Sequence, residues 1–212
     1  MYSGQLEIDA VLNERIFKNK KNGFYLECGA FDGIIDSNTL FFNKHMGWSG
    51  VNIEPLPNIF LELEKNRKND LNIKAALSDQ TGKKIFTQAI APDVSHYNGH
   101  FGNGSLEHTE LHLNQLNERK CLFEKIEVET YTLPDLFDKF KIDKCIDLFS
   151  LDVEGHEIKV LSKLPLIPTS LHPKIFVVEY GHCGYANLIK TMEEIEYKEV
   201  YSDNINVIFQ KL

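Results

Sequence analysis

The stretch that decides the fold is Phe24-Tyr25-Leu26-Glu27-Cys28-Gly29-Ala30-Phe31-Asp32-Gly33. It is a short apolar run that ends in an acid and continues directly into a glycine-rich turn. A second run, Gly50-Val51-Asn52-Ile53-Glu54-Pro55, also ends in an acid and follows about one strand–helix–strand unit later. This layout is typical of the nucleotide-binding half of a Rossmann-like fold, so we predict an α/β protein.

The two acids indicate which nucleotide ligand such a site would take. A dinucleotide places its pyrophosphate over the glycine turn, where helix-terminal N–H groups bind an anion. Glu27, directly before the turn, would repel a pyrophosphate but suits the ammonium and sulfonium groups of S-adenosylmethionine (SAM). Glu54 can accept hydrogen bonds from ribose hydroxyls. The alternative is an ordinary strand–turn–helix with incidental acids, but the two acids together with this turn favour SAM.

Other residues near these strand ends complete the predicted cofactor site. Gly29 and Gly33 allow close approach of the backbone to the methionine end of SAM. Asn38 either reaches the SAM carboxylate or belongs only to the first turn of a helix. Ala75 and Ala76 either flank the adenine or belong to the core. The predicted cofactor residues are Glu27, Gly29, Ala30, Gly33, Asn38, Glu54, Pro55, Ala75, Ala76 and Asp152.

Length and composition narrow the class of protein. The 212 residues have an ordinary hydrophobic content, which predicts one domain over 1–212. A net charge of −8 argues against a nucleic-acid partner, because phosphates require a basic face. The four cysteines show no close paired spacing, which indicates a reducing compartment. We find no signal peptide and no apolar run of membrane-spanning length, so we expect a cytoplasmic protein.

Hydrophobic periodicity places the expected elements along the chain. An amphipathic helix is predicted at 5–17, within an N-terminal helical segment of 1–22. Predicted strands are 24–28, 51–54, 71–77, 146–152 and 174–179, with a closing hairpin of 197–201 and 205–210. Further strands are expected at 84–90 and 125–131. Predicted helices are one capped by Ser37, then 58–66, 133–140, a segment through Ile158 and Leu161, and 185–195.

One segment has no apolar period. Residues 91–105 are rich in Gly, Asn and His, and a polar helix is expected to follow at 106–117. Loops of this length inside a compact domain are often functional. We therefore expect 91–118 to form a substrate lid that contacts a hydroxyl-rich acceptor and is less ordered without it.

With these pieces in place, about the whole chain resembles the FkbM family of SAM-dependent methyltransferases. The most specific motif is Ser150-Leu151-Asp152-Val153-Glu154-Gly155-His156-Glu157. Besides the two stretches quoted first, shorter matches are Ser37-Asn38-Thr39, Gly47-Trp48-Ser49, Asn66-Arg67, Ala75-Ala76-Leu77-Ser78 and Thr132-Leu133. The resemblance implies a class I methyltransferase fold: a mostly parallel seven-stranded sheet, helices on both faces and an antiparallel C-terminal hairpin. It also implies O-methylation, most often of sugars or small secondary metabolites.

The catalytic candidates lie at the carboxyl ends of predicted strands, because open α/β sheets bind their ligands there. Asp152 ends the fourth predicted strand of the main sheet and Glu179 ends the fifth. His182 lies just beyond and is suited to accept a hydroxyl proton. His156 is the remaining candidate, although the family often has a small residue there, so no role carries over to it. Glu154 and Glu157 follow Asp152 as further acids, either supporting the site or stabilised by a helix N-terminus.

Two interpretations of this acceptor side remain open. Asp152, Glu179 and His182 form either a base-and-orienter set or a site for a divalent ion, with magnesium or manganese favoured over zinc. The resemblance does not require an ion, so we predict a metal-free site. Histidines spaced by four could share a helix face, but they lack the glutamate of a zinc-protease motif. These pairs are His96 with His100 and His108 with His112.

The sequence thus predicts a SAM-dependent O-methyltransferase for a sugar hydroxyl in glycan or polysaccharide biosynthesis. Such an enzyme would be fused to a glycosyltransferase or act with one, and the oligomeric state stays open. The first alternative is a methyltransferase of a non-sugar metabolite, which the cofactor half does not distinguish. The second is a catalytically silent SAM- or glycan-binding module. The intact Asp152 and the complete cofactor signature argue against a catalytically silent module.

Overall fold

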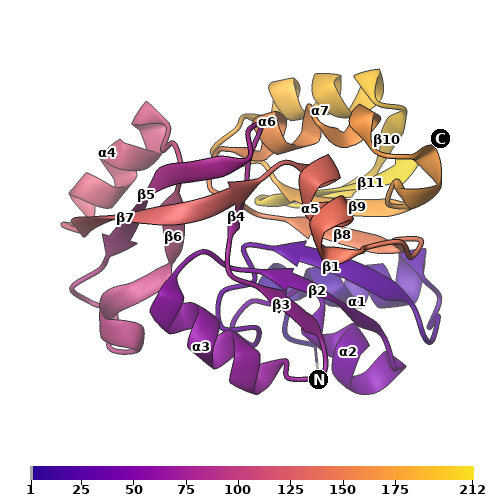
Figure 1. Cartoon of the computed structure of the whole chain (residues 1–212), viewed down its shortest axis with the longest axis horizontal. Helices are drawn as coiled ribbons and strands as arrows, with labels where there is room; N and C mark the ends of the chain where they lie inside the picture. Colours follow the sequence, from indigo (N-terminus) through magenta and orange to yellow (C-terminus); the bar gives the residue numbers. More distant parts are fainter. Residues whose placement is uncertain (1) are drawn as a thin grey trace.

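A seven-stranded sheet runs through the middle of the molecule (Figure 1). The computed structural model describes residues 2–212. The strands are β1 Phe24–Cys28, β2 Ser49–Ile53, β3 Leu71–Ile73, β8 Leu148–Leu151, β9 Ile175–Glu179, β10 Tyr197–Ser202 and β11 Asn206–Lys211, in the order β10-β11-β9-β8-β1-β2-β3. All pairings are parallel except the two that β11 makes with β9 and β10. The predicted fold class, with its antiparallel C-terminal hairpin, is confirmed.

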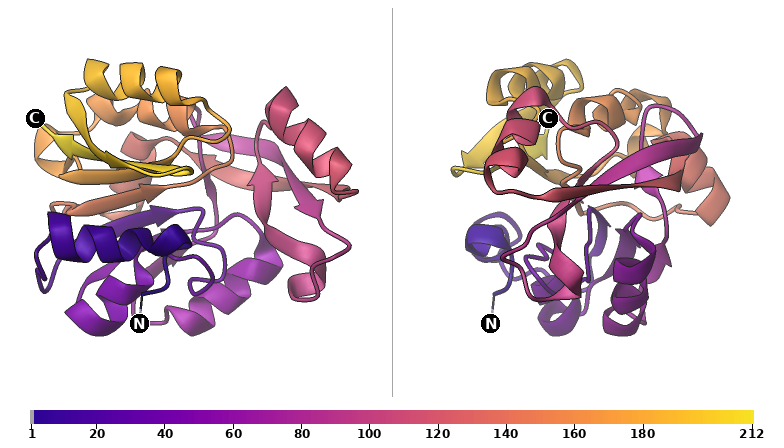
Figure 2. Two further views of the ribbon diagram at one scale, coloured as in Figure 1. Left: turned by 180° about the vertical axis from the view of Figure 1, so that it is seen from behind. Right: turned by 90° about the vertical axis from the view of Figure 1, so that its left-hand side faces the viewer.

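Helices cover both faces of this sheet (Figure 2). On one face lie α5 Leu133–Phe140, α6 Glu157–Leu161 and α7 Tyr185–Glu194, whose apolar side chains share one core with the strands. On the other face lie α2 Leu40–Met46 and an N-terminal helical segment. That segment consists of a 3-10 turn Gln5–Glu7, α1 Ile8–Val11 and a π-helical turn Leu12–Ile16. The helical residues therefore occupy only part of the expected range 1–22.

A second, four-stranded sheet lies beside the carboxyl ends of β1 and β2. Its order is β4-β7-β5-β6, formed by β4 Ala76–Leu77, β5 Gly82–Ile90, β6 His100–Ser105 and β7 Leu122–Tyr131. The helix α4 Glu110–Glu118 connects β6 to β7 (Figure 1). No helix among residues 2–212 is both long and apolar enough to span a membrane.

Three sequence predictions for the region around the second sheet are wrong. The single strand expected at 71–77 is divided, because the chain turns at Lys74, where the Ala75 amide donates to the Ile73 carbonyl at 3.1 Å. Its second half becomes β4 and pairs with β7. The segment 91–105, expected to be a loop, contains β6, which pairs with β5. The polar helix begins at Glu110, four residues later than expected.

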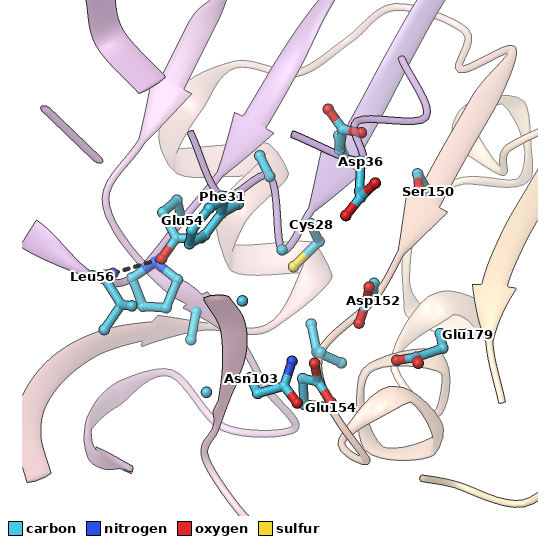
Figure 3. Close-up of a pocket in the computed structure, with 18 of the residues that line it drawn as sticks. Cys28, Phe31, Asp36, Glu54, Leu56, Asn103, Ser150, Asp152, Glu154 and Glu179 are labelled. Carbon is cyan, nitrogen blue, oxygen red and sulfur yellow. Dashed lines mark hydrogen bonds between the residues drawn. The ribbon is translucent and has the colours of Figure 1, made fainter. Parts of the chain in front are cut away.

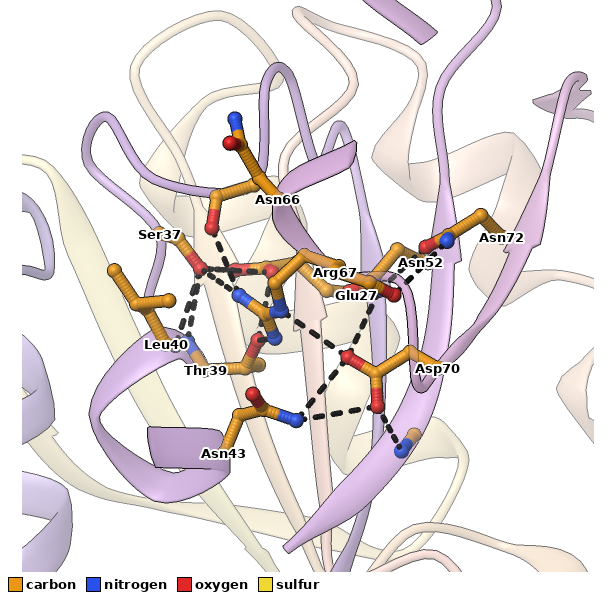
Figure 4. A network of polar contacts seen from close by, with 12 residues as sticks. Glu27, Ser37, Thr39, Leu40, Asn43, Asn52, Asn66, Arg67, Asp70 and Asn72 are labelled. Carbon is orange, nitrogen blue, oxygen red and sulfur yellow. Dashed lines mark hydrogen bonds and ion pairs between the residues drawn. The ribbon is translucent and has the colours of Figure 1, made fainter. Parts of the chain in front are cut away.

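A buried arginine fixes the end of β1 relative to α3 Pro57–Asn66. Alternation along a strand places Tyr25 and Glu27 on the same face of β1. Arg67, directly after α3, is only 2% exposed on that face. Its Nε donates to Asp70 at 3.1 Å (Figure 4). Its Nη2 donates to the Tyr25 hydroxyl at 2.7 Å and its Nη1 to the Gly33 carbonyl at 2.9 Å. Five fixed donors let one guanidinium bind strand, turn and helix end together.

The same guanidinium organises the turn before α2. Arg67 also donates to the hydroxyls of Thr39 and Ser37. Both hydroxyls donate onward to the Glu27 carboxylate, Thr39 at 2.7 Å and Ser37 at 2.9 Å (Figure 4). Ser37 was expected to cap α2, and its oxygen does accept the Leu40 amide hydrogen at 3.2 Å. The residue at the N-cap position itself is Thr39.

We predict that Arg67→Met strongly destabilises the protein. The change leaves Glu27 and Asp70 buried without their cation, and breaking a buried pair in this way costs about 3–5 kcal/mol. Lys65→Met is the matched control, because Lys65 is exposed near the end of α3 and, among residues 2–212, forms an ion pair with Glu62 alone. Its effect should stay within about 0.5 kcal/mol. Urea denaturation measures both. A loss in Arg67→Met no larger than in the control would contradict the assigned role.

Candidate active site

A cavity of about 440 Å³ opens at the carboxyl ends of β1, β2 and β8, with the second sheet forming its outer wall (Figure 3). Small-molecule sites usually enclose about 300–1,000 Å³. Nine of the ten predicted cofactor residues line the cavity, and Gly33 does not. All four catalytic candidates line it as well: Asp152, Glu179, His182 and His156. The fold therefore brings together nearly the whole set that the sequence predicted.

The two glycines of the turn serve different purposes. Gly29 has φ of +80°, and a Cβ atom there would lie 1.9 Å from the backbone oxygen of Asp152. Only glycine lets the turn after β1 pass this close to the end of β8. Gly33 lies away from the cavity, and a Cβ atom there would lie 2.6 Å from Cγ of Arg67. Its small size makes room for the buried arginine, and its contact with SAM stays a prediction.

Glu54 is held at one end of the cavity by two backbone amides (Figure 3). Its Oε2 accepts the Phe31 N–H at 3.1 Å, and its Oε1 accepts the Leu56 N–H at 2.9 Å. Burial raises the pKa of Glu54 to about 7. Each carboxylate oxygen can accept more than one hydrogen bond, so both keep capacity for a ligand hydroxyl.

Glu27 and Asn38 lie deeper in the cavity. The Glu27 carboxylate already accepts the hydroxyl hydrogens described above, so its first task is to hold the turn, and its contact with SAM stays a prediction. Asn38 donates to the Ser150 hydroxyl at 3.0 Å, while its buried Oδ1 has no partner. Sequence reasoning missed Ser150 and Asp36, which also line this wall. A single serine within the apolar run of β8 was the available signal.

Three carboxyl groups gather at the other end of the cavity, away from Glu54 (Figure 3). Asp152 follows β8, Glu179 ends β9, and Glu154 lies in the loop between β8 and α6; one oxygen of each lies within 4.8 Å of the others. Burial raises the pKa of all three. The pKa of Glu179 reaches about 12, with the Asp152 charge as the next cause after burial. Glu179 therefore keeps its proton and donates it to Asp152.

Two histidines adjoin this carboxyl cluster. His182 Nε2 lies 3.1 Å from Glu154 Oε2. The His182 ring stacks on His112 of α4, with centroids 3.7 Å apart and planes within 10°. Burial lowers the pKa of both, that of His112 to about 3. No local pattern predicts the contact of His112 with His182, because 70 positions separate the helix α4 from the loop after β9.

His156 has different surroundings. Its Nε2 lies 3.1 Å from the Ser78 hydroxyl, and its Nδ1 lies 4.0 Å from Glu107. Burial lowers the pKa of His156 to about 4, so its ring is neutral near pH 7. The ring lines the cavity but is engaged by Ser78 rather than by the carboxyl cluster. A catalytic role for His156 stays a prediction.

The chain was compared with known proteins. Residues 27–199 match the model of the methyltransferase FkbM domain. Among solved structures, a human methyltransferase 10 domain containing protein is 11% identical, covers 97% of this chain and 80% of its own, and has a TM-score of 0.46. A methyltransferase from Pyrococcus furiosus is 11% identical, with coverage of 97% and 82% and a TM-score of 0.43. The N-terminal domain of human METTL16 is 10% identical, with coverage of 96% and 66% and a TM-score of 0.46.

The curated proteins contain no significant match to this chain.

The site also contains a carboxyl group whose ionisation should cost stability. Glu157 is fully buried: its Oε1 accepts the amide hydrogens of Val153 and Gly155, while its Oε2 has no partner. Burial raises the pKa of Glu157 from 4.5 to about 7. A raised carboxyl pKa means that the folded state binds the proton more tightly than the unfolded state. The cost is therefore absent below pH 4.5, grows through the interval up to 7 and is complete above it.

We predict that Glu157→Gln stabilises the protein at pH 8 by up to about 3 kcal/mol, at about 1.4 kcal/mol for each unit of pKa. The amide oxygen can keep both backbone hydrogen bonds while the buried charge is lost. Near pH 4.5 the gain should be small, because the native carboxyl is then protonated. Thermal unfolding at both pH values tests this, with the exposed Glu64→Gln as control. An equal gain at both pH values would point to packing instead.

Proposed function

The chain belongs to the FkbM methyltransferase family, and from this membership we propose that it is a SAM-dependent O-methyltransferase for a sugar hydroxyl. One observation carries the proposal. A single cavity has a backbone-held carboxylate, Glu54, at one end and an unpartnered carboxylate oxygen, Asp152 Oδ1, at the other. The first suits a ribose and the second suits an acceptor hydroxyl.

The residues on the cofactor side fit SAM. Glu54 would accept the ribose hydroxyls, and Ala75 and Ala76 leave room for a flat base beside β4. Asn38 Oδ1, buried without a partner, suits the ammonium group at the methionine end. An ionised Asp152 gives this end of the cavity a negative charge, which favours a sulfonium cation. When bound, SAM supplies an electrophilic methyl group on positively charged sulfur.

The acceptor side provides alignment and a proton acceptor. Most catalysis of such a displacement comes from holding the attacking oxygen in line, which a fixed hydrogen-bond acceptor achieves. The side-chain hydrogen bond with Glu179 lowers the pKa of Asp152 against the rise that burial causes. When Asp152 is ionised, its free Oδ1 can orient a hydroxyl and take its proton as the bond to carbon forms. His182 is less suited to be the base, since burial lowers its pKa and its Nε2 faces Glu154.

The outer wall favours a neutral, hydroxyl-rich acceptor. Asn103 and His96 come from the expected lid, 91–118, and face the cavity with polar groups, while Phe86 and Phe101 offer flat apolar surface. This mixture suits a sugar ring, which has both polar edges and apolar faces. The protein's net charge of −8 disfavours an acidic acceptor.

The setting we propose is glycan or polysaccharide biosynthesis in the cytoplasm, where a glycosyltransferase, fused or separate, would supply the sugar. The same cavity would also admit the hydroxyl of a non-sugar metabolite, so that class belongs in any substrate test.

We predict that the protein binds SAM and its demethylated product, and that Glu54→Ala weakens both. The lost hydrogen bonds to a charged group are worth about 1.5–3 kcal/mol, or roughly 10- to 150-fold in affinity. Isothermal titration calorimetry measures the effect, with Glu64→Ala on the exposed side of α3 as control. Undiminished affinity in Glu54→Ala would remove Glu54 from the ribose site, and no binding by the native protein would reject the proposed function.

We predict that Asp152→Asn slows methyl transfer at least about 100-fold, the lower range of a lost proton acceptor, and leaves SAM affinity within a few fold. The assay incubates the protein and SAM with a panel of free sugars, oligosaccharides and phenolic metabolites and detects the methylated product by mass spectrometry. Full activity in Asp152→Asn would place the acceptor elsewhere. Turnover only with phenolic metabolites would replace the sugar proposal, and SAM binding without any turnover would favour a silent module.

A further inference from the structure

The N-terminal segment reaches the cavity at a residue that lies outside the matched family domain. Gln5 lines the cavity, whereas the match to the FkbM domain covers residues 27–199. The Oε1 of Gln5 accepts the Nδ2 hydrogen of Asn206 at 3.3 Å. Asn206 is only 2% exposed and pairs in register with Glu179 across β11 and β9. Gln5 is therefore tied to the sheet at the edge where the site is built.

The bond with Asn206 sets the direction of the Gln5 amide. A glutamine side chain has one acceptor oxygen and one amino group with two hydrogens. Because the oxygen of Gln5 faces Asn206, its Nε2 group is left to donate to another partner. At the wall of a cavity, such a group suits a negatively charged oxygen of a ligand.

Gln5 also lies beside the wall that the proposed function assigns to the methionine end of SAM. A Cβ atom on the preceding residue, Gly4, would lie 2.8 Å from Asn38 Oδ1. The proposed function places the SAM ammonium group at that oxygen. In an α-amino acid, two bonds separate the ammonium nitrogen from the carboxylate carbon, a distance of roughly 2.5 Å. The SAM carboxylate must therefore lie close to Asn38 as well, beside the segment that carries Gln5.

Other donors on this wall are already engaged. Among residues 2–212, no lysine or arginine lines the cavity. The side-chain amino group of Asn38 is engaged, and its backbone N–H bonds to the Glu27 carboxylate. The next two backbone amides, those of Thr39 and Leu40, donate to the Ser37 hydroxyl. A carboxylate at this wall consequently needs a donor from another segment.

From these contacts we propose that Gln5 binds the methionine carboxylate of SAM through its Nε2 group, with Asn206 as the residue that orients it. The inference rests on the proposed function, because it concerns the same cofactor. It assigns a direction to the methionine end of SAM, with the ammonium group at Asn38 and the carboxylate at Gln5. The acids Glu27 and Asp36 also line this part of the cavity and favour the ammonium group. An N–H group that donates to a carboxylate makes a charge-assisted hydrogen bond, which is stronger than a neutral one.

The turn that presents Gln5 is held in place by buried contacts. Asp9 is fully buried, and its Oδ2 accepts the Ser3 amide hydrogen at 2.8 Å. Ile8 packs in the core on this face of the sheet. Leu6, directly after Gln5, has φ of 51°, in the left-handed region that large side chains seldom adopt. Such strain persists only where the surrounding structure imposes it, and it is concentrated at ligand sites.

The test compares SAM with decarboxylated SAM, which keeps the sulfonium and the amine but lacks the carboxylate, by isothermal titration calorimetry on the full chain at pH 8. Gln5→Ala should weaken SAM binding roughly 10-fold or more, as expected for a lost hydrogen bond to a charged group. Its affinity for decarboxylated SAM should stay nearly unchanged. Gln5→Glu should weaken SAM binding further, because two carboxylates then face each other, and should keep or raise the affinity for decarboxylated SAM.

Two further variants separate the binding role from an effect on folding. Gln210→Glu makes the same charge change at an exposed residue of β11 and should leave both affinities unchanged. Asn206→Ala should weaken SAM binding in the native background but not in the Gln5→Ala background, where the oriented amide is already absent. Thermal unfolding of each variant shows whether the fold is retained.

The possible outcomes distinguish this inference from the proposed function. Equal losses for SAM and decarboxylated SAM in Gln5→Ala would mean that Gln5 only supports the fold, and would overturn the inference. An unchanged SAM affinity in Gln5→Glu would overturn it too. Both results leave the proposed function intact, because SAM still binds to the native protein. No SAM binding by the native protein would instead reject the proposed function, and this inference with it.

Discussion

The buried guanidinium of Arg67 is the interaction on which the rest of the structure depends. A charge taken out of water is tolerated only when excellent geometry and several hydrogen bonds compensate it. Here the compensation comes from β1, the glycine turn, the residues before α2 and Asp70 after α3, all at once. None of these segments can move without leaving a buried charge unpaired. Under the proposed function these contacts would pre-organise the cofactor side of the cavity and so reduce the entropy lost on binding.

The opposite end of the cavity is destabilised by buried carboxyl groups that lie close together. Asp152, Glu154, Glu157 and Glu179 are brought together where the guanidinium does not reach, and the first three each raise the pKa of at least one of the others. This arrangement costs stability, and proteins usually accept such a cost at functional sites. A cation lowers the cost, whether it is a sulfonium or a metal ion. The end near Arg67 therefore stabilises the fold, whereas the carboxyl-rich end would be stabilised by a bound cation.

Sequence reasoning succeeded where the signal is local. The strand Phe24–Cys28 and the helix Leu133–Phe140 have the predicted bounds. The strand is a short, continuously buried apolar run that ends at the glycine turn, and the helix buries Leu133, Leu136 and Phe137 at helical spacing. The acids at strand ends were also found, since parallel strands end at one edge of the sheet. Sequence reasoning failed for contacts between residues that are distant in the sequence. The β6 strand lacks an apolar period and exists because β5 pairs with it, and the importance of Arg67 lies in contacts that no local pattern records.

Under the proposed function, acceptor specificity would lie in the second sheet. The main sheet supplies Glu54, which two backbone amides hold, and Asp152, whose backbone lies against Gly29, so change there threatens the fold. The second sheet and α4 pack partly on a small core of their own, formed by Ala89, Ala91, Leu116 and Cys121. Its cavity-facing residues, such as Phe101 and Asn103, have few ties to the main core. Substitutions in this wall can therefore change which acceptor fits while the cofactor end stays intact, as expected when function is built on loops over a rigid scaffold.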